Sequence, residues 1–153
     1  MQLGARRAGR EEGGFSYRHA RVAVIDGSMA GMSLAYRLDD PGDPAEPESL
    51  PPMVRPLVEL EALAPGSWYI NAVAAYPEWR GQGVGNALMM DCEEAAVAGG
   101  VNVMSLIVAS ENAAAHRLYL RLGYRETATR PLVTWPGGPR GGNWILMVRE
   151  LLN

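Results

Sequence analysis

An arginine followed by three alternate glycines is the part of this sequence best suited to chemistry: Arg80, Gly81, Gly83 and Gly85. Glycine has no Cβ atom, so the backbone N–H groups beside it can approach a ligand closely. The residues that follow are typical of a helix start, where unpaired N–H groups and the helix dipole favour an anion. The pattern predicts a cradle for a diphosphate, although a tight strand-to-helix connection without a ligand also explains the glycines alone.

Two other phosphate-binding glycine patterns do not fit this turn. The spacing Gly81-x-Gly83-x-Gly85 is not G-x-G-x-x-G, and no acidic residue ends a following strand about twenty residues later, so a dinucleotide site is excluded. No Lys-Ser or Lys-Thr pair follows the glycines, so a nucleoside triphosphate loop of the Walker type is excluded as well.

The turn and the second half of the chain together resemble the GCN5-related N-acetyltransferases (GNAT), which transfer an acyl group from acyl-CoA to an amine. Residues 80–85, Arg-Gly-Gln-Gly-Val-Gly, fit the family motif R/Q-x-x-G-x-G/A at every position, and Tyr-Pro-Glu-Trp at 76–79 is a usual lead-in. The resemblance covers roughly residues 15–151. A second motif follows at the family's spacing: Leu106, Val108, Asn112, Ala115, Tyr119, Gly123 and Tyr124.

The resemblance implies that acetyl-CoA is the acyl donor and that its diphosphate lies on the glycine turn. It further implies that the preceding strand separates from its neighbour, so that backbone groups of Val73, Ala74 and Ala75 bind the pantetheine arm. The Val73 N–H is then the donor expected to polarise the thioester carbonyl. Small side chains allow such an approach, but they also pack well beneath a helix. The cofactor residues expected in the turn are Arg80, Gly81, Gln82, Gly83, Val84, Gly85 and Asn86.

Asn112 and Tyr119 are seven residues apart, about two helical turns, so they are predicted to share one helix face. The resemblance implies that Asn112 binds the pantetheine arm or an ordered water, and that Tyr119 protonates the departing thiolate. A tyrosine with its reference pKa of about 10 is protonated at neutral pH and can act as this acid. Without the motif, a tyrosine packed against the sheet is the plainer interpretation. His116, between them, is interpreted as a surface residue.

The sequence assigns no general base. An alkylammonium with a pKa near 10 is only about 0.1% neutral at pH 7, so its deprotonation needs a carboxylate or a chain of waters. Histone-acetylating relatives carry a glutamate early in the strand before the turn, where this chain has Ser67. Glu59 and Glu61 are interpreted as solvated residues of a helix surface, and Glu78 as part of the turn.

The elements that must position these residues follow from the hydrophobic pattern. Alternation predicts a strand at 20–25, a turn at Asp26-Gly27 and a returning strand that ends near residue 38. The fold class is predicted to be α/β (α+β), with a mixed, mostly antiparallel twisted sheet flanked by helices. Further strands are predicted at 68–75, 101–109, 124–129 and 144–150, and helices at 53–64, 84–98 and 111–122.

The first residues of the chain depart from the family pattern. The family normally opens with a strand and one or two helices before the hairpin, and here only residues 1–14 precede it. These residues are expected to be a helix remnant, and the first strand and first helix are expected to be lacking. An uncovered sheet edge would favour pairing with a second protomer, so a homodimer is one expected outcome. Residues 39–56 are expected to form a proline-rich acidic loop.

Composition limits the classes of function. A chain of 153 residues, 48% hydrophobic and 20% charged, is the size of one globular domain, assigned here to residues 1–153. The net charge of −3 argues against a nucleic-acid partner, and no apolar run approaches the roughly 20 residues needed to span a membrane. One cysteine and two histidines predict no disulfide and no metal site, and a cytoplasmic protein. Cys92 is interpreted as a core residue.

Taken together, the motifs predict an N-acetyltransferase that moves an acetyl group from acetyl-CoA to a primary amine of a small molecule or peptide, by direct transfer in a ternary complex. The alternative is a non-catalytic acyl-CoA-binding regulatory module. The unassigned base and the short N-terminal part favour the alternative, whereas Tyr119 favours the enzyme. Trp135, in the Pro- and Gly-rich loop 131–142, is the tryptophan most suited to contact a substrate.

Overall fold

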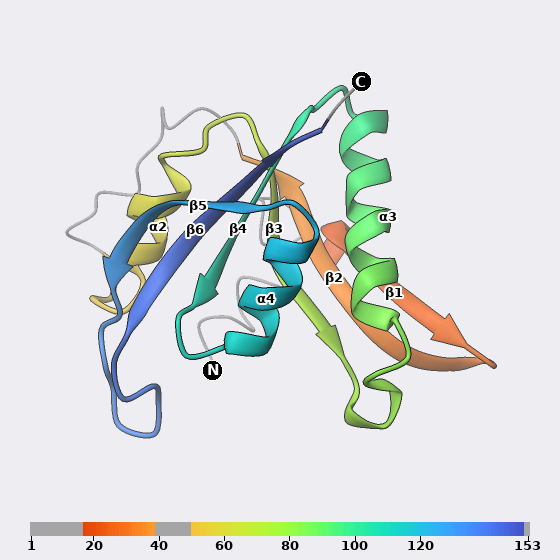
Figure 1. The fold of residues 1–153 in the computed structure, drawn as a ribbon, viewed down its shortest axis with the longest axis horizontal. Helices are drawn as coiled ribbons and strands as arrows, with labels where there is room; N and C mark the ends of the chain where they lie inside the picture. Colours follow the sequence, from red (N-terminus) through yellow and green to blue (C-terminus); the bar gives the residue numbers. More distant parts are fainter. Residues whose placement is uncertain (1–16, 39–49, 152–153) are drawn as a thin grey trace.

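Six strands form one sheet in the order β1-β2-β3-β4-β6-β5, and every neighbouring pair is antiparallel except β3 with β4 (Figure 1). The computed structural model describes residues 17–38 and 50–151, so the expectations for residues 1–14 and for most of the loop 39–56 lie outside the described residues. The predicted fold class is confirmed. The strands are β1 (Ala20–Ile25), β2 (Ser28–Arg37), β3 (Trp68–Ala75), β4 (Val103–Ala109), β5 (Arg125–Pro131) and β6 (Asn143–Glu150).

Helices cover both faces of the sheet. Leu106 packs in the cluster that contains residues of α3 and α4, whereas its neighbour Ile107 packs in the cluster that contains Leu60 of α2. Because successive strand residues point to opposite faces, α3 and α4 lie on one face and α2 lies on the other. The helices are α2 (Arg55–Glu61), α3 (Val84–Ala98) and α4 (Ala113–Arg121), with short 3₁₀ turns η1 (Tyr17–His19) and η3 (Pro77–Trp79).

The first hairpin forms at the predicted turn. Asp26 has φ 50° and Gly27 has φ 78°, and two successive positive φ angles are what a two-residue hairpin turn requires. The returning strand β2 is buried along most of its length, and both of its faces contribute: Ala35 packs with the α3 cluster, and Leu34 packs with Tyr69 on the other face. Strand β2 therefore contributes side chains to the core from both of its faces, whereas β1 is largely exposed.

Strands β3 and β4 diverge after a short parallel contact. They pair only from Trp68–Ile70 to Met104–Leu106, whereas β3 remains paired with β2 as far as Ala75. Leu34 of β2 pairs with Ala72 and Ala35 pairs with Ile70, so Asn71 is an extra residue in β3. Such a bulge bends a strand and increases its twist. The bulge lies where contact with β4 is lost, and Figure 1 shows the lower ends of the two strands spreading apart.

The bounds of β3 and α3 agree with those predicted from the sequence, and Cys92 is confirmed as a core residue, 1% exposed. It packs with Met89 and Ala96 of α3 against the sheet. Helix α2 is shorter than the predicted 53–64, and Pro56 occupies its first turn, where a missing N–H costs nothing. The elements on either side of the glycine turn are therefore those that the hydrophobic pattern indicates.

Candidate functional site

The glycine turn connects η3 to α3 and presents backbone groups to open space. Gly81 has φ 74° and Gly83, the N-cap of α3, has φ 82°, both in the region that favours glycine. A Cβ atom built on either residue would have no atom within 4 Å. No side chain caps α3, and its first intrahelical bond runs from the Ala87 N–H to the Gly83 carbonyl at 3.0 Å. The N–H groups of the first turn are thus oriented for an anion.

The side chains of the turn divide between structural roles and solvent. Gln82 Nε2 donates to the Glu78 carbonyl at 3.2 Å, which braces the turn. Val84 is 5% exposed and packs with Leu88 in the core, so a ligand can meet only its backbone. Arg80 is exposed and carries the one guanidinium of this turn. These contacts fix the backbone of the turn and leave Arg80 available to an anion above it.

The strand before the turn has a free backbone edge where β4 has moved away. The Tyr76 N–H donates to the Ala30 carbonyl of β2 at 2.9 Å. Because N–H groups alternate sides along a strand, Ala74 also faces β2, whereas Val73 and Ala75 face the gap between β3 and β4. Three residues were expected to bind the pantetheine arm. The backbone N–H of Ala74 faces β2, so only those of Val73 and Ala75 face the gap.

Tyr119 is carried by α4, which follows β4 and lies in front of the gap between β3 and β4 (Figure 1). Its ring packs against the α3 core cluster, with its centroid 6.1 Å from that of Tyr124. Burial raises the pKa of Tyr119 above its ordinary value, so the phenol keeps its proton at neutral pH. A Cβ on Gly85 would lie 4.0 Å from Leu118 Cδ2, so α4 also adjoins the first turn of α3.

Asn112 is the N-cap of α4, and the helix begins two residues later than the predicted residue 111. Its Oδ1 accepts a hydrogen bond from the Ala115 N–H at 3.3 Å, as a helix cap does. The expectation that Asn112 and Tyr119 lie within one helix is therefore corrected. With its oxygen used by the cap, the Asn112 Nδ2 group is the part of the side chain suited to a ligand carbonyl.

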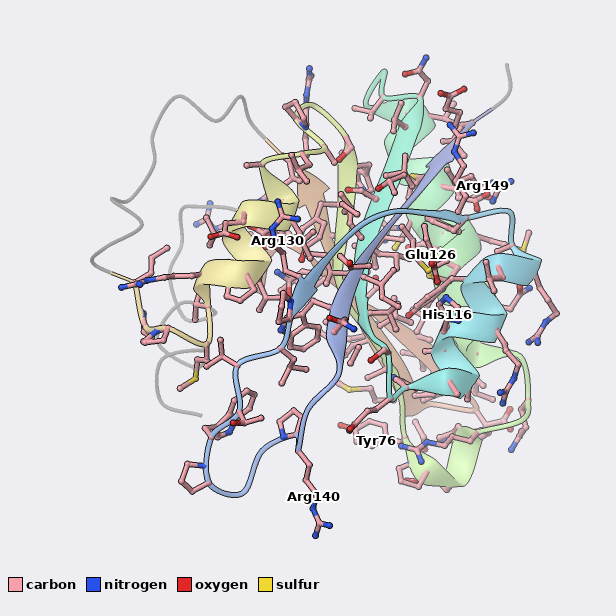
Figure 2. All side chains as sticks on the ribbon, turned by 60° about the vertical axis from the view of Figure 1, so that its left-hand side comes forward. Tyr76, His116, Glu126, Arg130, Arg140 and Arg149 are labelled. Atoms are coloured by element: carbon pink, nitrogen blue, oxygen red, sulfur yellow. The ribbon has the colours of Figure 1, made fainter. Side chains whose placement is uncertain are left out.

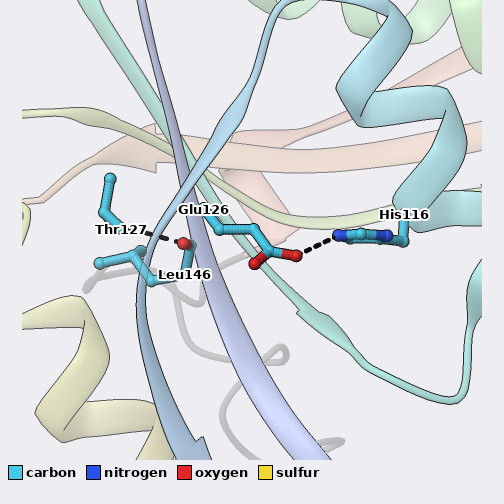
Figure 3. A network of polar contacts seen from close by, with 4 residues as sticks. All are labelled: His116, Glu126, Thr127 and Leu146. Carbon is cyan, nitrogen blue, oxygen red and sulfur yellow. Dashed lines mark hydrogen bonds and ion pairs between the residues drawn. The ribbon is translucent and has the colours of Figure 1, made fainter.

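His116 is partly exposed and has a partner that the sequence did not indicate. Its side chain is 24% exposed, and its Nε2 lies 2.5 Å from Glu126 Oε1, which joins α4 to β5 (Figure 3). Thr127 Oγ1 donates to the Leu146 carbonyl at 3.3 Å and joins β5 to β6. No spacing rule links a helix residue to a residue on the next strand, so the pair could not be found from the sequence. It fixes the helix that carries Tyr119.

Two of the residues considered as a general base, Ser67 and Glu59, have partners within the protein. Ser67 is 1% exposed; its Oγ donates to the Ala64 carbonyl at 2.7 Å and lies 2.6 Å from Ser105 Oγ. Glu59 forms an exposed ion pair with Arg130 at 3.1 Å, and Figure 2 shows Arg130 beside α2, away from Tyr76.

The buried hydroxyl of Tyr124 makes a prediction about stability possible. Tyr124 is 2% exposed, and its hydroxyl has no hydrogen-bond partner among the described residues. Burial, with a smaller effect of Glu93, raises the pKa of Tyr124 well above 10.0. Above pH 10 the phenol ionises in the unfolded protein but stays protonated in the folded one. The free energy of unfolding therefore falls as the pH rises above 10. We expect Tyr124→Phe to raise the free energy of unfolding by about 1 kcal/mol at pH 7 and by more at pH 10.5.

Urea unfolding at both pH values measures the effect. Tyr76→Phe is the matched control, because that tyrosine is 46% exposed. Removal of its hydroxyl should leave the free energy of unfolding unchanged at both pH values. A loss of stability at pH 7 in Tyr124→Phe would show that the hydroxyl has a partner and would contradict the prediction.

Among residues 17–38 and 50–151, no three His, Cys, Asp or Glu side chains are grouped closely enough to hold a metal ion. No helix among these residues has the length and apolar character needed to cross a membrane.

A known protein family contains both the glycine turn and the diverging strands. The family described as Acetyltransferase (GNAT) matches residues 5–124, which is most of the chain. The chain belongs to the GNAT acetyltransferase family. No curated protein sequence matches it. The matched residues include the glycine turn, β4 and α4.

Solved GNAT structures share the fold at low sequence identity. A polyamine N-acetyltransferase of Drosophila melanogaster is 20% identical, with a TM-score of 0.64 over 88% of this chain and 76% of that one. The ribosomal-protein-S18-alanine N-acetyltransferase of Escherichia coli is 20% identical, with a TM-score of 0.60 over 86% and 68%. The yncA protein of Salmonella typhimurium, solved with acetyl-CoA as its cofactor, is 20% identical, with a TM-score of 0.59 over 88% and 65%.

Proposed function

We propose that this GNAT protein transfers an acetyl group from acetyl-CoA to a primary amine of a small molecule or a peptide, by direct transfer in a ternary complex. One observation carries the proposal: the open turn before α3, the free edge of β3 and the helix that bears Tyr119 meet at one end of the sheet. Two of the similar structures, a polyamine and a ribosomal-protein alanine N-acetyltransferase by description, act on amines of these two kinds.

The turn has the properties that a diphosphate requires. Gly81 and Gly83 leave open space where side chains would stand, and the first N–H groups of α3 lack a side-chain cap. Arg80 adds a positive charge beside them. When bound there, acetyl-CoA supplies the activated acyl carbon. Val73 and Ala75 would hold the pantetheine arm through their backbone groups, and Asn112 Nδ2 would donate to one of its carbonyl oxygens.

Two groups of the chain then act on the reacting atoms. The Val73 N–H donates to the carbonyl oxygen, where negative charge develops as the amine nitrogen attacks the carbonyl carbon. The new C–N bond forms, the C–S bond breaks and its electron pair stays on sulfur. Tyr119 gives its proton to that sulfur, the amine releases a proton to solvent, and solvent restores the proton of Tyr119. The raised pKa of Tyr119 suits an acid and argues against a role as the base.

Amine-dependent thiol release tests the proposal. We expect purified protein with acetyl-CoA to release free thiol only when an amine is present, and to yield an acetylated amine that mass spectrometry identifies. A panel of polyamines, amino acids and peptides with free N-termini covers the two acceptor kinds. Binding of acetyl-CoA without thiol release from any amine would contradict the enzyme and favour the regulatory module.

A further inference from the structure

The backbone of β3 reverses the side to which it points between the two ends of the strand. The Leu38 N–H donates to the Ser67 carbonyl at 2.8 Å, so this carbonyl faces β2. The N–H of the same peptide group, that of Trp68, points the opposite way, toward β4. Regular alternation would also turn the Tyr76 N–H toward β4, because Tyr76 is an even number of positions further along. Instead, the Tyr76 N–H donates to the Ala30 carbonyl of β2 at 2.9 Å.

The extra residue of the bulge, Asn71, accounts for this reversal. Side chains reverse at the same place: Ile70 packs in the α3 core cluster, whereas Ala72 packs with Tyr69 on the other face of the sheet. In a regular strand, residues separated by one position share a face. The Val73 N–H faces the gap between β3 and β4 only because the extra residue precedes it. Without the bulge, this N–H would face β2.

A side-chain hydrogen bond joins the extra residue to β2. Asn71 Nδ2 donates to Tyr36 Oη at 3.1 Å in a partly buried contact. Tyr36 pairs with Tyr69 in the strand register, so its ring reaches along the strands to meet Asn71. The bond therefore connects the regular part of the ladder to the bulge, on the face of the sheet opposite α3.

The acceptor of this bond is held by its neighbours. Tyr36 is 9% exposed, and its ring makes an edge contact with Tyr69, with centroids 5.8 Å apart and an angle of 74° between the rings. The ring of His19 lies 5.7 Å away on a tilted plane. Asn71 is the one amide side chain of β3, and asparagine is disfavoured in strands. The residue least suited to a regular strand thus lies where the ladder has an extra residue, bonded to a fixed partner.

We propose that Asn71 and Tyr36 are positioning residues for acetyl transfer. Their hydrogen bond keeps the extra residue of β3 at position 71 and so keeps the Val73 N–H directed into the gap. A shift of the bulge past Val73 would turn that N–H back toward β2. An oxyanion donor is effective only if it is in place before negative charge develops on the carbonyl oxygen. The inference rests on the proposed acetyl transfer, since it concerns the donor for that reaction.

Infrared spectroscopy of bound acetyl-CoA, isotope-labelled at the thioester carbonyl, reports on the Val73 N–H without turnover. A hydrogen bond to the carbonyl lowers its stretching frequency, so we expect Tyr36→Phe and Asn71→Ala each to raise the frequency relative to the wild type. Tyr36→Phe removes one oxygen and keeps the ring contacts, so it carries the test if Asn71→Ala does not fold. Thr127→Val is the matched control. It removes the 3.3 Å bond from Thr127 Oγ1 to the Leu146 carbonyl, between β5 and β6, and should leave the frequency unchanged.

Steady-state kinetics give a second readout. We expect Tyr36→Phe and Asn71→Ala each to lower kcat about tenfold, with the KM for acetyl-CoA changed by less than about twofold. The double variant should lose no more than either single variant, because both substitutions remove the same bond. Losses that multiply in the double variant, or an equal loss of kcat in Thr127→Val, would overturn the inference.

The two readouts separate this inference from the proposed function. Amine-dependent thiol release that is unchanged in both variants, with an unchanged carbonyl frequency, supports acetyl transfer and overturns the inference. A carbonyl frequency that rises in Tyr36→Phe and in Asn71→Ala but not in Thr127→Val, with no thiol release from any amine, supports the positioning of the Val73 N–H and contradicts acetyl transfer.

Discussion

We expect Gly83→Ala to weaken CoA binding about 100-fold while the protein remains folded. A Cβ at this position meets no protein atom, so it projects into the space where the diphosphate is proposed to approach the backbone. Loss of two charge-assisted hydrogen bonds, at roughly 1.5 kcal/mol each, gives an effect of this size. Isothermal titration calorimetry with CoA measures it, and urea unfolding measures the cost of placing alanine at φ 82°, about 1–2 kcal/mol.

Two glycines provide matched controls for this variant. Gly66 has φ 74°, its Cβ would also stand in open space, and it precedes β3 at the opposite end, so Gly66→Ala carries the same backbone strain without touching the turn. Gly85 lies inside α3, and the family motif allows alanine there, so Gly85→Ala should keep CoA binding and stabilise the helix by about 1 kcal/mol. Unchanged CoA affinity in folded Gly83→Ala would show that the turn is a connection without a ligand.

Local signals were sufficient to predict most of the fold. The positive-φ turn at Asp26-Gly27, the strand 68–75 and the helix 84–98 depend on turn chemistry and on apolar spacing within a few residues, and all three are confirmed. The divergence of β3 from β4 was expected only from the family resemblance. Its physical cause, the bulge at Asn71, depends on how β2 and β3 align, which the spacing of apolar residues in either strand does not reveal.

The parts that could not be predicted are contacts between elements distant in the chain. The His116–Glu126 pair and the Ser67–Ser105 hydrogen bond each need two elements to be packed before the partners meet. Asn112 illustrates a different difficulty: the same side chain suits a helix cap and a ligand, and the sequence favours both. The cap uses Oδ1 and leaves Nδ2 free to donate to a ligand. The role of Asn112 in binding the pantetheine arm stays a prediction.

We expect Tyr119→Phe to lower turnover by about 10², or about 2.7 kcal/mol of transition-state free energy, with little change in acetyl-CoA affinity. Phenylalanine keeps the ring's packing against the α3 core cluster and removes only the proton that is proposed to reach the thiolate. Because burial raises the pKa of Tyr119 above 10.0, the wild-type acid persists through neutral pH and is lost only above pH 10. The rate of the wild type should therefore fall above that pH, and the variant should lack this fall.

Tyr124→Phe is the control that makes this result specific. The two rings have centroids 6.1 Å apart; Tyr124 is buried in the α3 core cluster and Tyr119 is partly buried against it, so both variants test the packing of the same region. If Tyr119 is the acid, only Tyr119→Phe slows turnover, and Tyr124→Phe affects stability alone. Equal losses of turnover in the two variants would point to disturbed packing of α4. Full activity of Tyr119→Phe across the pH range would remove Tyr119 from the mechanism, and the thiolate would then leave unprotonated or take its proton from solvent.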